Sequence, residues 1–140
     1  MQADINHSVS KMYILTPREE LLCKEIVDCA YKVHKKIGPG LLERIYETCF
    51  CYELSKKGIR FKRQVALHLK YDEMTFDEGI RIDVIVEDLI ICEIKAREEV
   101  NSVWMAQILS YLVMTDKHVG FVLNFKVPLI KDGIRRICKN

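Results

Sequence analysis

The chain has 140 residues, of which 49% are hydrophobic and 30% charged, and its formal net charge is +2. This balance is typical of one globular domain, and it excludes a disordered chain, a collagen-like chain and a bundle of membrane spans. No apolar run reaches the ~18 residues of a membrane helix. Residues 1–70 contain 13 Lys and Arg against 8 Asp and Glu, and residues 71–140 contain 9 against 12. Composition alone favours an uneven solvated surface over separate cation- and anion-binding regions.

Cysteine usage and the N-terminus bear on the compartment. Six cysteines show neither a CxxC pair nor zinc-site spacing. Four of them lie in apolar stretches, where a cysteine behaves as a small hydrophobic residue: Cys23, Cys29, Cys49 and Cys92. We therefore expect a reducing, cytoplasmic compartment. Residues 1–10 lack the apolar stretch of a signal peptide. We expect residues 1–15 to be disordered or weakly ordered and residues 16–140 to form a single domain.

Two helices are predicted in the first part of the chain. Thr16-Pro17-Arg18-Glu19 is a capping box with proline at the first helical position. Apolar residues then recur at helical spacing as far as Ile37. Gly38 is expected to end this helix in a left-handed conformation, and the following proline prevents its continuation. A second helix follows Gly40, with an apolar stripe through Leu42, Ile45, Tyr46, Cys49 and Phe50, and it ends at Gly58.

The pattern then changes to the period of two that is typical of strands. The expected elements are a strand over 64–71, a polar turn over 72–79, strands over 80–86 and 89–96, a helix over 102–116, a strand over 119–125 and a last turn over 134–137. In the strand over 80–86, Ile82 and Val84 belong to one alternating apolar set. The order ααβββαβ predicts an α/β fold in which helices flank a mixed sheet of about four strands.

Charged residues interrupt two of these core strands. Asp83 lies in one, and Glu93 and Lys95 lie two residues apart in the next, so that both point to the same side. A three-residue hairpin loop over 87–89 would place Asp83 directly opposite Glu93. Adjacent carboxylates repel each other unless a cation lies between them, and dense oxygen ligands suit Mg²⁺ or Mn²⁺. The alternative, a salt bridge between Asp83 and Lys95, is favoured for single residues, whereas the set favours a functional site.

Two helices carry further candidate residues. Glu43 lies in the first turn of the second helix, where the helix dipole alone would favour it, although its apolar neighbours place it near the buried side. Gln107 and Tyr111 lie four residues apart and therefore share a helix face. An amide and a hydroxyl there could orient a phosphate or a catalytic group, whereas a polar edge on an amphipathic helix is the simpler interpretation.

Together these residues resemble a known family. Asp83 followed by Glu93-Ile94-Lys95 resembles the core motif of the PD-(D/E)XK nuclease superfamily, with Ile82 in place of its usual proline. Gln107-x-x-x-Tyr111 resembles the helix motif of the RecB-type exonuclease branch. The segment from Gly40 through Glu43 to Tyr46 matches GxxExxY, the pattern that names a family of small proteins within that superfamily. The resemblance covers most of the chain and implies a PD-(D/E)XK, or restriction-endonuclease-like, core.

The resemblance also implies roles for these residues. One or two Mg²⁺ or Mn²⁺ ions would be held by three carboxylates and one backbone carbonyl: Glu43, Asp83, Glu93 and the carbonyl of Ile94. Lys95 would be the catalytic lysine, and Gln107 and Tyr111 would support the site. His34 also matches the family's pattern, and a histidine at the edge of the core is favoured over an outer metal ligand.

The implied activity is metal-dependent hydrolysis of phosphodiester bonds in nucleic acid, with DNA favoured. The alternatives are a non-catalytic nucleic-acid- or metal-binding module on the same fold, and a phosphatase that acts on small nucleotides. A homodimer would supply the two sites needed to cut both strands of a duplex.

A basic segment could bind the phosphates of such a substrate. Its residues are Lys56, Lys57, Arg60, Lys62 and Arg63, and no acidic residue lies between Leu54 and Lys70. A solvated helix end and strand edge is an equally favoured interpretation. The segment shows no aromatic interleaving strong enough for a base-stacking platform.

Overall fold

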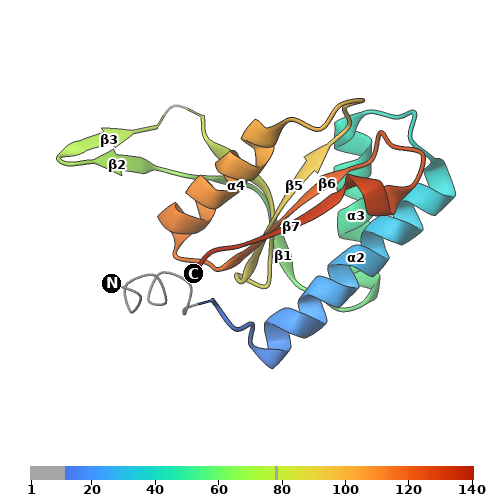
Figure 1. The fold of residues 1–140 in the computed structure, drawn as a ribbon, viewed down its shortest axis with the longest axis horizontal. Helices are drawn as coiled ribbons and strands as arrows, with labels where there is room; N and C mark the ends of the chain where they lie inside the picture. Colours follow the sequence, from blue (N-terminus) through green and yellow to red (C-terminus); the bar gives the residue numbers. More distant parts are fainter. Residues whose placement is uncertain (1–11, 78) are drawn as a thin grey trace, which may run out of the picture.

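The computed structural model describes residues 12–77 and 79–140. Its elements are α2 (Pro17–Ile37), α3 (Glu43–Lys56), β1 (Phe61–Ala66), β2 (Leu69–Tyr71), β3 (Met74–Phe76), β4 (Arg81–Val86), β5 (Ile90–Lys95), α4 (Ser102–Thr115), β6 (Val119–Asn124), the 3₁₀ helix η1 (Ile130–Gly133) and β7 (Ile134–Cys138). Within these residues, five strands form a mixed sheet in the order β1-β4-β5-β6-β7, with β5 and β6 parallel. The strands β2 and β3 form a separate hairpin that projects from the body (Figure 1). The expected α/β class is confirmed.

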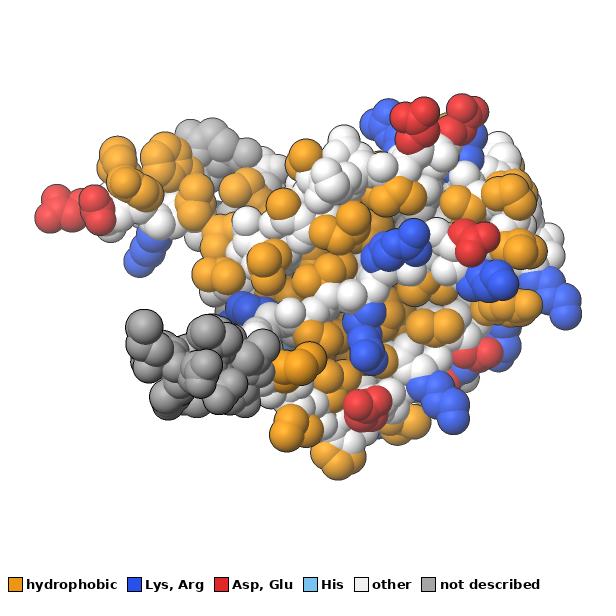
Figure 2. All heavy atoms as spheres, in the orientation of Figure 1, with side chains coloured by type: hydrophobic (Ala, Val, Ile, Leu, Met, Phe, Trp, Pro, Cys, Tyr) orange, Lys and Arg blue, Asp and Glu red, His pale blue; other side chains and the backbone are white. Residues whose placement is uncertain are grey.

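Helices cover both faces of the sheet. On one face, α2 and α3 bury the larger hydrophobic cluster, in which the Tyr46 and Phe125 rings stack with centroids 4.5 Å apart. On the other face, α4 packs through Ile108, Tyr111 and Leu112. The outer side of α4 remains largely apolar, since its sequence contains no charged residue (Figure 2). None of the helices in the described parts of the chain has the length and apolar character needed to cross a membrane.

The sheet differs from expectation in two places. The predicted strand over 64–71 is divided between β1 and β2, because β2 turns back at Asp72, with φ of 53°, and pairs with β3 inside the predicted turn. The tail over 134–138 is not a last turn but the edge strand β7, antiparallel to β6. Two adjacent arginines hide its period of two from the sequence pattern, and an edge strand tolerates them because it is exposed. The main sheet therefore has five strands instead of about four.

The predicted start of the first helix is confirmed as a capping box. The Thr16 hydroxyl accepts a hydrogen bond from the Glu19 N–H (3.1 Å), and the Glu19 carboxylate accepts from the Thr16 N–H (2.8 Å) and the Tyr13 hydroxyl (2.6 Å). Tyr13 also stacks on His118, with ring centroids 3.9 Å apart. Residues 1–11 of the segment expected to be weakly ordered lie outside the described residues.

The C-terminal end of α2 differs in one detail from the predicted left-handed cap at Gly38. Gly38 has a positive φ of 71°, as a glycine cap requires, but its ψ of −172° lies outside the left-handed helical region. The chain therefore leaves the helix in an extended direction, towards the loop that begins α3.

Glu19→Gln tests the electrostatic part of the capping box. Burial acts to raise the pKa of Glu19, but hydrogen bonds from Tyr13 and Thr16 outweigh it and lower the pKa below its ordinary value. The ionised carboxylate therefore stabilises the fold above its unfolded-state pKa, and this stabilisation is lost as pH falls through the folded-state pKa. We expect Glu19→Gln to lower the free energy of unfolding by about 1 kcal/mol at neutral pH, and the loss to shrink on acidification.

Urea unfolding at a series of pH values measures this difference, with the exposed neighbour variant Glu20→Gln as the control. A difference between wild type and Glu19→Gln that is the same at every pH would contradict the argument.

Candidate functional site

The pairing of β4 with β5 fixes the position of the two carboxylates. Val84 pairs with Cys92 and Val86 with Ile90, so the hairpin loop is 87–89 and Asp83 lies opposite Glu93, as expected from the sequence. The Asp83 N–H donates to Glu93 Oε2 (2.9 Å), and the Ile94 N–H donates to Asp83 Oδ2 (2.8 Å). Each carboxylate thus accepts one backbone hydrogen bond from the other strand.

An irregularity in β1 explains why the side chains of β1 and β4 change faces of the sheet next to Asp83. Gln64 has φ of 50°, a left-handed conformation that is uncommon in a strand, and it lies beside Asp83. Asp83 is followed by Val84, which belongs to the cluster under α2 and α3, and preceded by Ile82, which belongs to the cluster under α4. The alternation that predicted one face for Ile82 and Val84 is therefore wrong, because the paired strands turn over at the acidic residue.

Burial makes the acid pair electrostatically unusual. The Glu93 side chain is only 4% exposed. Burial raises the pKa of Glu93 to about 9, with the charge of Asp83 acting in the same direction and that of Lys95 against it. The pKa of Tyr111 is also raised, by burial and then by the charges of Glu93 and Asp83. Tyr111 and the acid pair are therefore close enough to influence one another, and Gln107 acts on the Tyr111 hydroxyl from the same helix.

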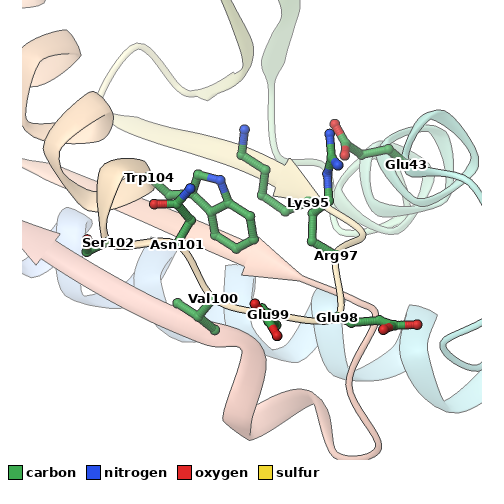
Figure 3. A pocket seen from close by; sticks show the side chains of 9 residues that line it. All are labelled: Glu43, Lys95, Arg97, Glu98, Glu99, Val100, Asn101, Ser102 and Trp104. Carbon is green, nitrogen blue, oxygen red and sulfur yellow. The ribbon is translucent and has the colours of Figure 1, made fainter.

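The loop before α3 positions Glu43. The Tyr46 hydroxyl donates to the carbonyl of Gly38 and accepts from the Leu41 N–H, so it ties the glycine-rich loop to the helix. Glu43 is the first residue of α3 and is exposed. Its side chain lines a cavity of about 770 Å³ that Lys95, Arg97 and Trp104 also line (Figure 3).

Two residues of the site were missed by sequence reasoning. Glu47, 6% exposed, accepts hydrogen bonds from Arg63 Nε (2.9 Å) and from Gln64 Nε2 (2.8 Å). Gln64 Nε2 also lies 3.3 Å from Asp83 Oδ1, to which it donates. The available signal was the spacing, since Glu47 lies one helical turn after Glu43.

The expected apolar stripe of this helix is partly wrong. Leu42 and Ile45 are exposed, and Glu47 and Cys51 occupy buried positions. A buried glutamate was not expected there because an unpaired charge in a core is costly, and the partners that compensate it lie on β1.

The donor set fits a divalent cation by its chemistry. Mg²⁺ and Mn²⁺ prefer carboxylate and carbonyl oxygens, and a cation relieves the repulsion within a buried carboxylate pair. Within residues 12–77 and 79–140, however, no three His, Cys, Asp or Glu side chains are grouped closely enough to hold a metal ion. Binding one ion through Glu43, Asp83 and Glu93 together would therefore require side-chain rotation.

The residues of the basic segment differ in their contacts. Lys56 pairs with Glu53 (3.1 Å), Lys57 pairs with Glu25 and Asp28 on α2, and Arg63 pairs with Glu47 (2.9 Å). Arg60 and Lys62 are exposed and line a different cavity, beside the β4–β5 hairpin loop. Of the five residues predicted to bind nucleic acid, Arg63 is the one whose contacts join the network of Asp83.

His34 lies apart from the acid pair. Its Nε2–H donates to the carbonyl of Val127 (2.8 Å), in the loop between β6 and η1. This contact attaches α2 to that loop, as suits a histidine at the edge of the core.

Comparison with known proteins gives one finding that bears on this geometry. A family model described as the PD-(D/E)XK nuclease superfamily matches residues 20–137, which include all the elements from α3 to η1. No curated protein and no solved structure matched the chain. Because the family model spans most of the sequence, the chain belongs to the PD-(D/E)XK nuclease superfamily.

Proposed function

We propose that this protein is a metal-dependent nuclease that hydrolyses phosphodiester bonds, with DNA as its preferred substrate. We place it in the GxxExxY family, on the RecB-type branch. One observation carries the proposal: the half-buried Asp83 and the buried Glu93 lie together beside Lys95, whose side chain lines a cavity large enough for part of a substrate. Charged side chains are rarely buried in strand cores unless they are paired or serve a function.

The proposed roles are those that the resemblance to the nuclease motifs implies for these side chains. Glu43, Asp83, Glu93 and the carbonyl of Ile94 would hold Mg²⁺ or Mn²⁺, which when bound activates water and polarises a phosphate. The Lys95 ammonium lies on the same side of β5 as Glu93 and can stabilise the negative charge that develops on the phosphate oxygens. Gln107 and Tyr111 lie on α4, close enough to the acid pair for its charges to raise the pKa of Tyr111, and would support the site. Glu47 and Gln64 position Asp83 from the other side.

One observation favours the alternative of a non-catalytic binding module. Each carboxylate of the pair already accepts a backbone N–H, so the fold tolerates this site without an ion. A module that binds nucleic acid alone needs no further rearrangement, whereas a metal nuclease or a metal-binding module must exchange some of these contacts for metal bonds.

We further propose a single domain over 16–140, a cytoplasmic location and a homodimer. The oligomeric state is measured directly by sedimentation of the purified chain, and a monomer at all concentrations would reject the dimer.

A cleavage panel tests the proposed activity. Labelled single-stranded, duplex and branched DNAs and RNAs are incubated with the protein and Mg²⁺ or Mn²⁺. We expect DNA to be cut, chelation to stop cutting, and Asp83→Asn to abolish it, because the variant removes one charged ligand while keeping the size of the side chain. Asp72→Asn, in the β2–β3 turn, is the matched control and is expected to cut like wild type.

The same panel, extended with small nucleotides, separates the rival functions. Binding of nucleic acid without cleavage of any member would support the binding module. Hydrolysis of small nucleotides alone, unaffected by Lys62→Glu, would instead indicate a phosphatase, since a small substrate does not extend to that strand edge.

A further inference from the structure

The cavity beside Lys95 contains an aromatic side chain that the nuclease motifs do not account for. Trp104 lies one helical turn before Gln107 on α4 and is partly buried, with part of its surface packed on the cluster that includes Ile108. The rest of its side chain lines the cavity shared by Glu43, Lys95 and Arg97 (Figure 3). Trp104 is also the only tryptophan in the sequence.

Trp104 contacts the side chain of Lys95 through its ring. The Lys95 ammonium lies 5.6 Å from the centre of the indole ring, within the range of a cation–π contact. This contact places the aromatic surface next to the charge that we assign to the phosphate. A nucleotide whose phosphate approaches Lys95 therefore brings its own base, or the neighbouring one, to the indole.

Hydrogen bonds within the protein hold the β5–α4 loop, which forms part of the cavity wall. Asn124, only 1% exposed, accepts a hydrogen bond from the Arg97 N–H (3.0 Å) and donates to the Arg97 carbonyl (2.8 Å). These two bonds hold the start of the β5–α4 loop, and the Asn101 side chain caps α4 at the loop's other end by accepting from the Val103 N–H (2.9 Å). The loop that faces Trp104 is thus fixed at both ends, which lowers the ordering cost of binding.

We propose that Trp104 is a base-stacking platform, and that the substrate of this site is DNA with unpaired bases next to the scissile phosphate. The proposal rests on the nuclease function proposed above and narrows its substrate class. Every nucleobase has an apolar face that stacks on an aromatic ring, so the contact is independent of sequence. Inside a duplex both faces of a base are covered by its neighbours, so only a single strand, a flap or a frayed end offers a base to Trp104.

The charges around the cavity agree with one phosphate entering at Lys95. Lys95 and Arg97 supply positive charge, and Glu43 faces them as a candidate ligand of the ion. The loop acids Glu98 and Glu99 are exposed, and Glu98 is paired with Lys126 (3.7 Å). A strand whose phosphates lay along the loop would be repelled by these acids. A base directed at Trp104 is uncharged and is not repelled.

Fluorescence of the full chain tests the proposal without turnover. Emission excited in the indole band reports Trp104 alone, and chelator keeps the protein from cutting. The probes are a single-stranded oligodeoxynucleotide, the blunt duplex of the same sequence, and an abasic single strand with the same number of phosphates. We expect the base-bearing single strand to quench the emission, and the abasic strand and the duplex to quench it far less.

Binding of the labelled strands to variants supplies the second measurement. Trp104→Leu keeps an apolar side chain against the cluster under α4 but removes the aromatic face. Since base stacking contributes ~1–3 kcal/mol, we expect Trp104→Leu to weaken binding of the base-bearing strand roughly 5- to 150-fold. Binding of the abasic strand should be unchanged, and Trp104→Phe should restore part of the loss.

The outcomes distinguish the two proposals. If no strand binds to wild type and none is cut with metal present, the nuclease function fails and the stacking proposal with it. If strands are cut, but abasic and base-bearing strands quench equally or Trp104→Leu binds both as wild type does, the stacking proposal alone is overturned. If strands bind but none is cut with metal present, the nuclease function fails, and the quenching and the Trp104→Leu binding decide the stacking proposal.

Discussion

Lys95→Ala is expected to lower the rate of DNA cleavage by ~10²- to 10³-fold while leaving the fold intact. In phosphodiester hydrolysis, negative charge builds on the phosphate oxygens as the attacking water loses a proton. Lys95 is half-buried at the end of β5, beside Glu93 and over the ring of Trp104, which is where the proposed function requires a cation to meet that charge. Loss of this cation removes an interaction that is made mainly in the transition state, so kcat should fall more than KM changes.

Two comparisons make this prediction specific. Lys95→Arg should not fully restore activity, because a planar guanidinium cannot occupy the position of a compact ammonium. Lys24→Ala, on the exposed side of α2, is the matched control and should leave the rate unchanged. Lys95→Ala protein that cuts as fast as wild type would show that the activity comes from another site or from a contaminant.

Mg²⁺ or Mn²⁺ is expected to raise the melting temperature of wild type, and Asp83→Asn should lose most of this rise. An ion that binds only the folded protein stabilises it by about 2.7 kcal/mol at a free concentration ~100 times Kd. For a domain of this size that corresponds to roughly 10 °C. The physical source is the buried Glu93, since burial and the neighbouring Asp83 raise its pKa to about 9 and a divalent cation offsets both effects.

Asp83→Asn keeps an oxygen that can accept from the Ile94 N–H, so it changes the charge while preserving the hydrogen bond. Each protein is compared with its own metal-free melting temperature, which removes any direct effect of the substitution on stability. Asp72→Asn carries the same chemical change outside the site, at a positive φ that asparagine tolerates. Equal metal-induced shifts in Asp83→Asn and Asp72→Asn would mean that the ion binds elsewhere.

These two predictions and the stacking test address different parts of the site. The Lys95 variant reports on charge in the transition state, the Asp83 variant on the resting metal site, and the Trp104 variants on recognition of the base. A metal-binding module on this fold would keep the metal-induced shift, and a nucleic-acid-binding module would keep the quenching, but neither would show any cleavage.

Local sequence signals determined the helices and the register of the acid pair. The capping box at Thr16 and Glu19 formed as predicted, because all of its contacts lie within a few residues. The opposition of Asp83 and Glu93 followed from the period of two and from the three-residue hairpin loop, both of which are local properties. The α/β class followed from the change between helical and strand periods along the chain. The strands that were not predicted, β3 and β7, do not alter that class.

Tertiary structure decided everything that depends on contacts between distant segments. The left-handed Gln64 reverses the faces of β1 and β4, and no local pattern distinguishes it from an ordinary strand residue. The burial of Glu47 depends on Arg63 and Gln64, which lie on another element, and the edge strand β7 exists only because β6 is there to pair with it. The meeting of Trp104 with Lys95 likewise requires α4 to pack back on β5. The sequence thus determined which residues could carry the chemistry, and packing between distant segments determined which of them share a cavity.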